Sequence, residues 1–280
     1  MENKLKTALS ILLIATSAFA QKSLKTDADV AGAKFIKAVL NLGAVELNVK
    51  KCVEKSKAFK IVYNYSEDEK LPSLSYDVDD EKGFFTLSNG KGSDNLPFFG
   101  IHGEKDNVTL ELTGSVPLAV EANFGVCDAN VDLGGMMITS AVFSTGVSSF
   151  NLDFSNPNKV SCEDIKIKTG ISSISVRDLN NARAKYIELE GGVGSMKVDF
   201  GGDLQSDCEV QIKTGLGSVE ISIPSDINTT ITTPESFLTG VDVAGFYSEG
   251  GGVYRSKVKE GPHLRIKIDS GLGGVEVKAY

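Results

Sequence analysis

Several residue types that often carry chemistry are rare in this chain of 280 residues. It contains no tryptophan, four cysteines, four methionines and two histidines, His102 and His263. With so few histidines, the sequence has neither a Ser-His-Asp order nor a histidine-rich metal motif. The absence of tryptophan leaves any carbohydrate stacking to other aromatic side chains. We therefore predict no catalytic, cofactor-binding or metal-binding residues and no enzyme activity.

Basic clusters and long apolar runs are lacking as well. The chain has 37 Asp and Glu residues against 29 Lys and Arg residues, a formal net charge of −8. An acidic surface without a basic cluster argues against nucleic acid and anionic lipid as partners. After residue 20, no stretch is long and apolar enough to predict a membrane-spanning helix.

The first twenty residues have the pattern of a signal peptide. Lys4 and Lys6 precede the apolar run Leu9–Ala15, and Ala18-Phe19-Ala20 forms an A-x-A cleavage site. Residues 1–20 are therefore predicted to be removed before Gln21. We expect an exported protein, either periplasmic or extracellular at the cell surface.

A short phrase recurs along the chain. In Gly215–Ile223, small residues make a bend and are followed by alternating apolar and polar residues. Such alternation is typical of strands, and a fixed repeat is typical of a stacked array. The sequence predicts an all-β fold, a single elongated β-solenoid whose stacked coils of about 22 residues each hold two or three short strands. The marker glycines are Gly125, Gly146, Gly170, Gly192, Gly215, Gly240 and Gly271.

The chain is predicted to divide into a signal peptide (1–20), an N-terminal β module (21–103) and a continuous solenoid repeat region (104–280). Residues 33–49 alternate as a strand, with Ile36, Ala38, Leu40 and Leu42 on one side. The glycine-rich segments 88–103 and 244–253 are expected to be loops. We expect the N-terminal strand and the tail 278–280 to protect the exposed strand edges at the two ends.

The four cysteines are Cys52, Cys127, Cys162 and Cys208, and they contain no metal-type C-x-x-C pair. An exported protein permits disulfides, but small buried residues in a β core are the favoured interpretation. Cys162 and Cys208 occupy similar places in coils that are two apart. Stacking would separate their Cα atoms by about 9 to 10 Å, which predicts no disulfide between them.

Several phrases resemble a known family. The phrase Leu40–Leu47, followed by Phe59–Tyr65 and Pro72–Tyr76, resembles the N-terminal module of bacterial toast-rack proteins. The copies at Gly192, Gly215 and Gly271 are similar to repeats of that family, of related "putative adhesins" and of the C-terminal domain of cell-wall-active-antibiotic-response proteins. The resemblance covers residues 33–280. It implies a β-solenoid in the cell envelope without catalytic activity.

Some groups of residues could instead form a specific binding or catalytic site. Asp132, Asp153 and Asp199 could form an acidic groove, but solvent-facing alternates of strands are the simpler interpretation. The acidic run Asp77–Glu81 lacks the spacing of a calcium loop and is expected to be a solvated turn. Phe98-Phe99 and Phe246-Tyr247 are candidates for exposed recognition residues or for residues tucked against the core.

Two classes of function remain open from the sequence. The favoured one is a non-catalytic, adhesin-like envelope protein that binds an unknown envelope protein or a polysaccharide. The alternative is a polysaccharide lyase or hydrolase on a parallel β-helix. Converging carboxylates in a groove would favour the enzyme, whereas a stacked polar face would favour the binding protein.

Overall fold

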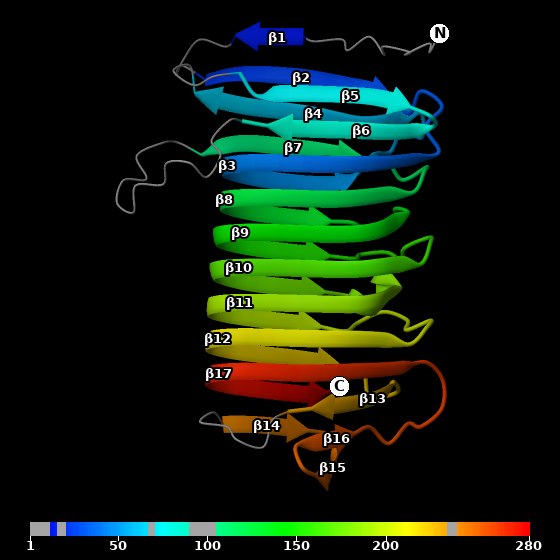
Figure 1. Ribbon diagram of the computed structural model, residues 1–280, viewed down its shortest axis with the longest axis vertical. Coiled ribbons are helices and arrows are strands. Elements are labelled where there is room, and N and C mark those ends of the chain that lie inside the picture. The colour runs from blue at the N-terminus through cyan, green and yellow to red at the C-terminus, as the bar shows by residue number, and fades with distance from the viewer. Residues whose placement is uncertain (1–11, 16–20, 67–70, 90–104, 234–239) are drawn as a thin grey trace.

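The computed structural model describes residues 12–15, 21–66, 71–89, 105–233 and 240–280. Seven long strands run parallel and stack along the molecule, each crossing the front, turning at one corner and returning behind (Figure 1). In spatial order they are β3 (Phe35–Lys51), β8 (Leu118–Asp132), β9 (Ile138–Asp153), β10 (Cys162–Arg177), β11 (Ala184–Asp199), β12 (Cys208–Ile223) and β17 (His263–Ala279). The molecule is therefore an all-β solenoid.

Each of these coils contains one long strand that continues through its bend. The prediction of two or three short strands per coil was wrong in this respect. Glycine occupies the bend of each coil because the backbone of the stacked coil lies too close there for a side chain. The bend glycines form a column which, from the N-terminal end, consists of Gly43, Gly125, Gly146, Gly170, Gly192, Gly215 and Gly271. A Cβ built on any of the six glycines after Gly43 would lie 2.2 to 2.8 Å from the carbonyl oxygen of the preceding glycine in the column.

The core lies between the two faces of the bent strands. In β10, Ile165, Ile167, Ile174 and Val176 are buried and their neighbours face outward. Rings from the two faces meet inside, as in Phe143 and Phe150, whose centroids are 5.0 Å apart. The predicted inward set of β3, from Ile36 to Leu42, is buried, so the alternation identified the core face correctly.

The coil at each end of the stack is interrupted where its bend would be. At the N-terminal end, β6 (Lys82–Ser88) pairs with the first half of β3 and β7 (Asp106–Leu112) pairs with the second half. At the C-terminal end, β13 (Asn228–Thr232) and β14 (Gly240–Ala244) pair in the same way with β17. Segment 88–103, expected to be a loop, lies outside the described residues from residue 90 onward.

Side chains replace the missing bend at the N-terminal end. The Gly43 amide donates a hydrogen bond of 3.0 Å to Asn89 Oδ1. Asn89 Nδ2 and the Tyr63 hydroxyl both donate to Asp106 Oδ2, at 3.0 and 2.6 Å. Buried polar groups need such partners, so this cluster closes the corner of β3.

Antiparallel strands lie beyond both interrupted coils. The N-terminal group contains β2 (Gln21–Asp29), β4 (Lys57–Ser66) and β5 (Ser73–Asp79), and β1 (Leu12–Ala15) pairs with β2. The C-terminal group contains β15 (Tyr247–Gly250) and β16 (Val253–Arg255). A 3-10 turn at Leu179–Ala182 precedes β11. No helix in the described part of the chain is long and apolar enough to cross a membrane.

The C-terminal coil does not follow chain order. The last strand, β17, lies between β12 and the pair β13 and β14 (Figure 1). Gly240 was therefore wrongly placed in the repeat, since it pairs with Gly274 rather than joining the bend column. The tail does not cap the end either: Tyr280 bonds back to Ile223 and Asp199. Segment 244–253 contains β15 and is not simply a loop.

All four cysteines are buried and free, as predicted, including Cys162 and Cys208. Burial raises the pKa of Cys127 to about 11 and that of Cys162 and Cys208 to about 12. At neutral pH these thiols are therefore protonated, and the thiolate is the reactive form. The cysteines contribute to packing in this fold.

We expect none of the four thiols to react with an alkylating reagent in the folded protein, and all four to react after unfolding without reductant. Burial blocks access and the raised pKa suppresses the thiolate. Mass spectrometry after alkylation with and without denaturant measures this. Fewer than four reactive thiols in the unfolded, unreduced chain would reveal a disulfide and contradict the structure.

A second column of glycines gives a sharp test of the bend. Gly273 has φ +145°, and a Cβ there would lie 1.6 Å from the Gly217 carbonyl oxygen. The neighbouring Gly274 has no atom within 4 Å of its Cβ position. We expect Gly273→Ala to lower the free energy of unfolding by about 2–4 kcal/mol, while Gly274→Ala changes it little. Urea unfolding of the two variants compares them directly.

Candidate functional site

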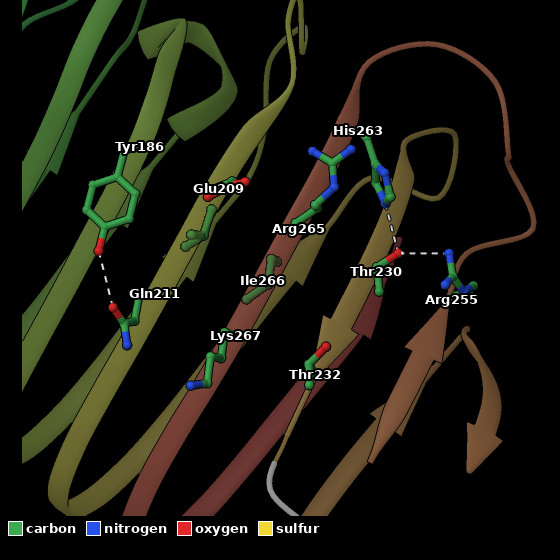
Figure 2. A pocket seen from close by; sticks show the side chains of 11 residues that line it. Tyr186, Glu209, Gln211, Thr230, Thr232, Arg255, His263, Arg265, Ile266 and Lys267 are labelled. Atoms are coloured by element: carbon green, nitrogen blue, oxygen red, sulfur yellow. Dashed lines mark hydrogen bonds between the residues drawn. The ribbon is translucent and has the colours of Figure 1, made fainter. Parts of the chain in front are cut away.

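A hollow of about 530 Å³ lies near the C-terminal end of the solenoid. It is formed on the outward side of β11, β12, β17, β13 and β16, and Figure 2 shows most of its side chains. The lining residues are Tyr186, Glu209, Val210, Gln211, Thr230, Thr232, Arg255, His263, Arg265, Ile266 and Lys267. This hollow is the candidate binding site.

Strand register aligns these side chains in two rows. The first row crosses five strands, and its successive members are Tyr186, Glu209, Arg265, Thr230 and Arg255. The second row places Gln211 beside Lys267 and Thr232. Neighbouring strands are about 4.8 Å apart, so polar groups recur at that spacing across the hollow.

Carboxylates outside the lining orient both arginines. Arg265 Nη2 lies 3.0 Å from Asp207 Oδ2, and Asp207 Oδ1 accepts the His263 backbone amide at 3.0 Å. These two hydrogen bonds lower the pKa of Asp207. Arg255 Nε is 2.7 Å from Glu249 Oε2. Because a guanidinium has five donors, each arginine keeps further N–H groups for a ligand.

His263 and Thr230 form a hydrogen-bonded group with Arg255 at one side of the hollow. The His263 Nε2 atom is 2.8 Å from Thr230 Oγ1, and Arg255 Nη1 donates to that oxygen at 3.4 Å (Figure 2). Burial lowers the pKa of His263, and the nearby Arg265 and Arg255 charges lower it further. A neutral ring can accept the Thr230 hydroxyl proton while the hydroxyl oxygen accepts from Arg255.

Tyr186 marks the opposite side of the hollow. Its hydroxyl donates to Gln211 Oε1 at 3.2 Å, which leaves the Gln211 amide hydrogens for other partners (Figure 2). Lys267 contacts Asp269 only loosely, at 3.6 Å. Together these residues offer hydrogen-bond donors and an aromatic ring, a combination suited to ligands rich in oxygen.

Paired carboxylates do not line the hollow. Among its lining residues, Glu209 is the only carboxylate. Hydrolysis of a glycosidic bond generally uses two carboxyl groups at a defined separation. The lining of the hollow therefore does not supply the pair of carboxyl groups that such hydrolysis uses.

The predicted candidate aspartates lie elsewhere, along one outward ladder. Strand register places Asp132 beside Asp153 and Asp153 beside Arg177. Val176 pairs with Val198, so Asp199 follows at the next position of β11. Arg177 lies between acidic neighbours, with Nη2 2.6 Å from Asp153 Oδ2. The residues are alternates of half-buried strands, as the simpler interpretation held, and Arg177 interrupts the acidic row.

Two of these aspartates stabilise turns. Asp132 Oδ1 accepts the Gly134 amide at 2.8 Å, and Asp132 Oδ2 accepts the Ser155 hydroxyl at 2.7 Å. Asp199 accepts the Gly201 amide at 3.2 Å and the Tyr280 hydroxyl at 3.0 Å. Short polar side chains commonly bond to backbone amides in this way where a chain turns.

The acidic run Asp77–Glu81 was expected to be a turn, but its first three residues end β5 and only Asp80 and Glu81 form the turn to β6. Asp80 and Glu81 have φ values of 47° and 63°, the left-handed conformation of a tight hairpin turn. Glu81 pairs with Lys34 at 2.7 Å, and both side chains are exposed. Among the described residues, no group of three or more His, Cys, Asp or Glu could hold a metal ion.

The aromatic candidates have divided outcomes. Phe246 is partly buried against the core, whereas Tyr247 is exposed with Lys257 Nζ 5.8 Å from its ring centroid. Phe98, Phe99 and His102 lie outside the described residues. The sequence did not predict the hollow, because the two rows of side chains that line it depend on β17 lying between β12 and β13. The alternation of apolar and polar residues shows only that each of these side chains faces outward.

The repeat architecture also appears in comparison with known families. The model described as the N-terminal domain of toast_rack, DUF2154, matches residues 16–177 and again residues 164–222. The chain belongs to this toast-rack family. The second match overlaps the first, as expected where one repeat resembles another. The toast-rack chain matches no curated protein.

One solved structure has a similar fold. A "putative cell adhesion protein" from Clostridium sporogenes is 19% identical, with a TM-score of 0.52 over 98% of this chain and 100% of that one. A "putative adhesin" from Bacteroides fragilis is 13% identical, with a TM-score of 0.28 over 92% of this chain and 97% of that one. The first likeness supports the solenoid architecture.

We expect Asp132→Ala to lower the free energy of unfolding by about 1 kcal/mol, because the turn loses its hydrogen-bond acceptor. Asp132→Asn keeps a side-chain oxygen for the Gly134 amide and should retain most of the stability. Thermal unfolding of both variants checks this. Equal losses in the two variants would show that the negative charge, and not the acceptor, stabilises the turn.

Proposed function

We propose that this toast-rack protein is a non-catalytic, adhesin-like protein of the cell envelope that binds a polysaccharide through the hollow. The observation that carries the proposal is the two rows of polar side chains, one across β11, β12, β17, β13 and β16 and the other across β12, β17 and β13. Saccharides present hydroxyl and carboxylate oxygens at regular intervals along a chain. A surface that presents polar side chains at a spacing of about 4.8 Å can form hydrogen bonds with several of those oxygens at once.

The chemistry of the lining supports a saccharide over a protein partner. Arg265, Arg255 and Lys267 supply charged donors, while Gln211 and Thr232 supply neutral ones. Tyr186 provides an aromatic ring at the edge where a sugar face can pack. The arginines are held by Asp207 and Glu249, which reduces the conformational entropy that a ligand would otherwise have to remove.

Export is part of the proposal and rests on residues 1–20. The A-x-A site ends at Ala20, and β2 begins at Gln21. Cleavage there would remove β1, which pairs with β2, and would leave β2 whole. The name of the Clostridium sporogenes protein, which shares the fold, is in keeping with an adhesive role at the cell surface.

A glycan array followed by titration with retained polysaccharides tests the binding site. We expect Lys267→Ala and Tyr186→Ala each to weaken binding about tenfold, since each removes a direct ligand contact. Lys197→Ala is the matched control: Lys197 is exposed on the other outward face and pairs with Glu220. Its binding should equal that of the wild type.

Thermal unfolding of each variant separates lost contacts from lost folding. Unchanged binding in Lys267→Ala and Tyr186→Ala, with the fold intact, would exclude the hollow as the site. Shortening of the polysaccharide during incubation, measured by size-exclusion chromatography, would instead establish the alternative function, a polysaccharide-active enzyme.

A further inference from the structure

An exposed apolar stripe runs along the bend corner, separate from the hollow. The residue after each bend glycine occupies the apex of the corner, and it is apolar in six successive coils. In register these residues, which we name the corner stripe, are Val126, Val147, Ile171, Val193, Leu216 and Leu272. Five of them, from Val147 to Leu272, are 44% to 59% exposed.

The fold does not require apolar side chains at these positions. The bend turns the apex residue outward, so its side chain adds little to the core. A polar residue would satisfy the same backbone geometry and would be better solvated. Six coils at about 4.8 Å give a continuous apolar line roughly 24 Å long. Contiguous exposed apolar surface of this kind generally marks an interaction site.

Charges of alternating sign flank one side of the stripe. Register places Lys168, Glu190, Lys213 and Asp269 side by side on β10, β11, β12 and β17. The other flank carries Ser173, Ser195 and Ser218 in register, which are uncharged. The order of the charged row is therefore plus, minus, plus, minus along the direction of stacking.

When this row of charges faces a reversed copy of itself, each positive charge faces a negative one. If a second copy lies antiparallel, related by a twofold axis between β11 and β12, Lys168 faces Asp269 of the second copy. Glu190 then faces Lys213 of the second copy, and the symmetry repeats both pairs. A parallel arrangement would place the charged row against the serine row and would form none of these pairs. Self-complementary contacts of this type are what a twofold dimer requires.

We propose that two copies of this chain associate antiparallel along the corner stripe, with the charged row setting their register. The corner stripe contributes buried apolar surface, and Lys168 and Lys213 form ion pairs with the charged row of the second copy. Lys168 and Lys213 already contact Glu188 at 3.7 and 3.3 Å in their own chain. The lysine side chains of these pairs are 50% and 38% exposed, and ion pairs near the surface contribute little, so exchanging them for pairs between copies costs little. The narrow contact predicts a weak, reversible dimer.

Sedimentation velocity of the full chain over a concentration series tests the association. We expect a monomer–dimer equilibrium that weakens as salt rises, because the flanking pairs are solvent-exposed. Leu216→Glu should abolish the dimer by placing a charge in the stripe. Lys197→Glu, which changes an exposed lysine on the other face, should leave it intact. A wild-type chain that stays monomeric at every concentration would overturn the proposal.

A charge exchange tests the register itself. Lys168→Glu and Asp269→Lys should each weaken dimerisation about tenfold, because each creates two like-charge contacts by symmetry. The double variant should restore it. Within one chain these residues lie three coils apart, about 14 Å, so rescue cannot arise from contact inside a monomer. Failure of the rescue, with all variants folded, would exclude this antiparallel arrangement.

Cross-linking gives a second readout that does not depend on charge. The twofold axis places Val193 of one copy beside Leu216 of the other. Mixed Val193→Cys and Leu216→Cys chains should form a disulfide heterodimer under mild oxidation. Mixed Ile171→Cys and Val193→Cys chains should not, because that pairing is out of register. The native cysteines are buried and do not interfere. Equal yields in both mixtures would contradict the assigned register.

Discussion

The contact between stacked glycine backbones is the constraint on which the rest of the structure depends. A carbonyl oxygen of one coil occupies the place where the next coil would carry a Cβ. This fixes where every strand bends and aligns all residues on either side of the bend. The buried columns, the rows of the hollow, the acidic ladder and the corner stripe are consequences of one shared register. A displaced bend would misplace all of them together.

Regular features of the fold could be predicted from the sequence because they are local. Alternation identified the inward face of residues 36–42, and the glycine phrases identified a stacked solenoid. The position of β17 could not be predicted in this way. Periodic glycines specify that coils stack, but neighbours in space need not be neighbours in sequence. Gly240 illustrates this limit, since it has the right spacing for the bend column and lies outside it.

The candidate site depends on that same departure from chain order. Arg265 lies between Glu209 and Thr230 only because β17 is inserted between β12 and β13. Arg255 and its partner Glu249 come from the excursion that separates β12 from β17. The conspicuous aspartates of the repeat stabilise turns and pair with their neighbours.

The inserted strand also constrains the order in which the molecule can be made. The residues of β17 are synthesised after β12, β13 and β14, yet they fill a space between these segments. Until they arrive, β12 has an open hydrogen-bonding edge, and β13 and β14 have no parallel neighbour. This end of the solenoid can therefore close only after β17 has been synthesised, while the N-terminal coils can already be stacked. An incomplete chain would present the β12 edge to other chains, which makes truncation near the C-terminus a direct route to aggregation.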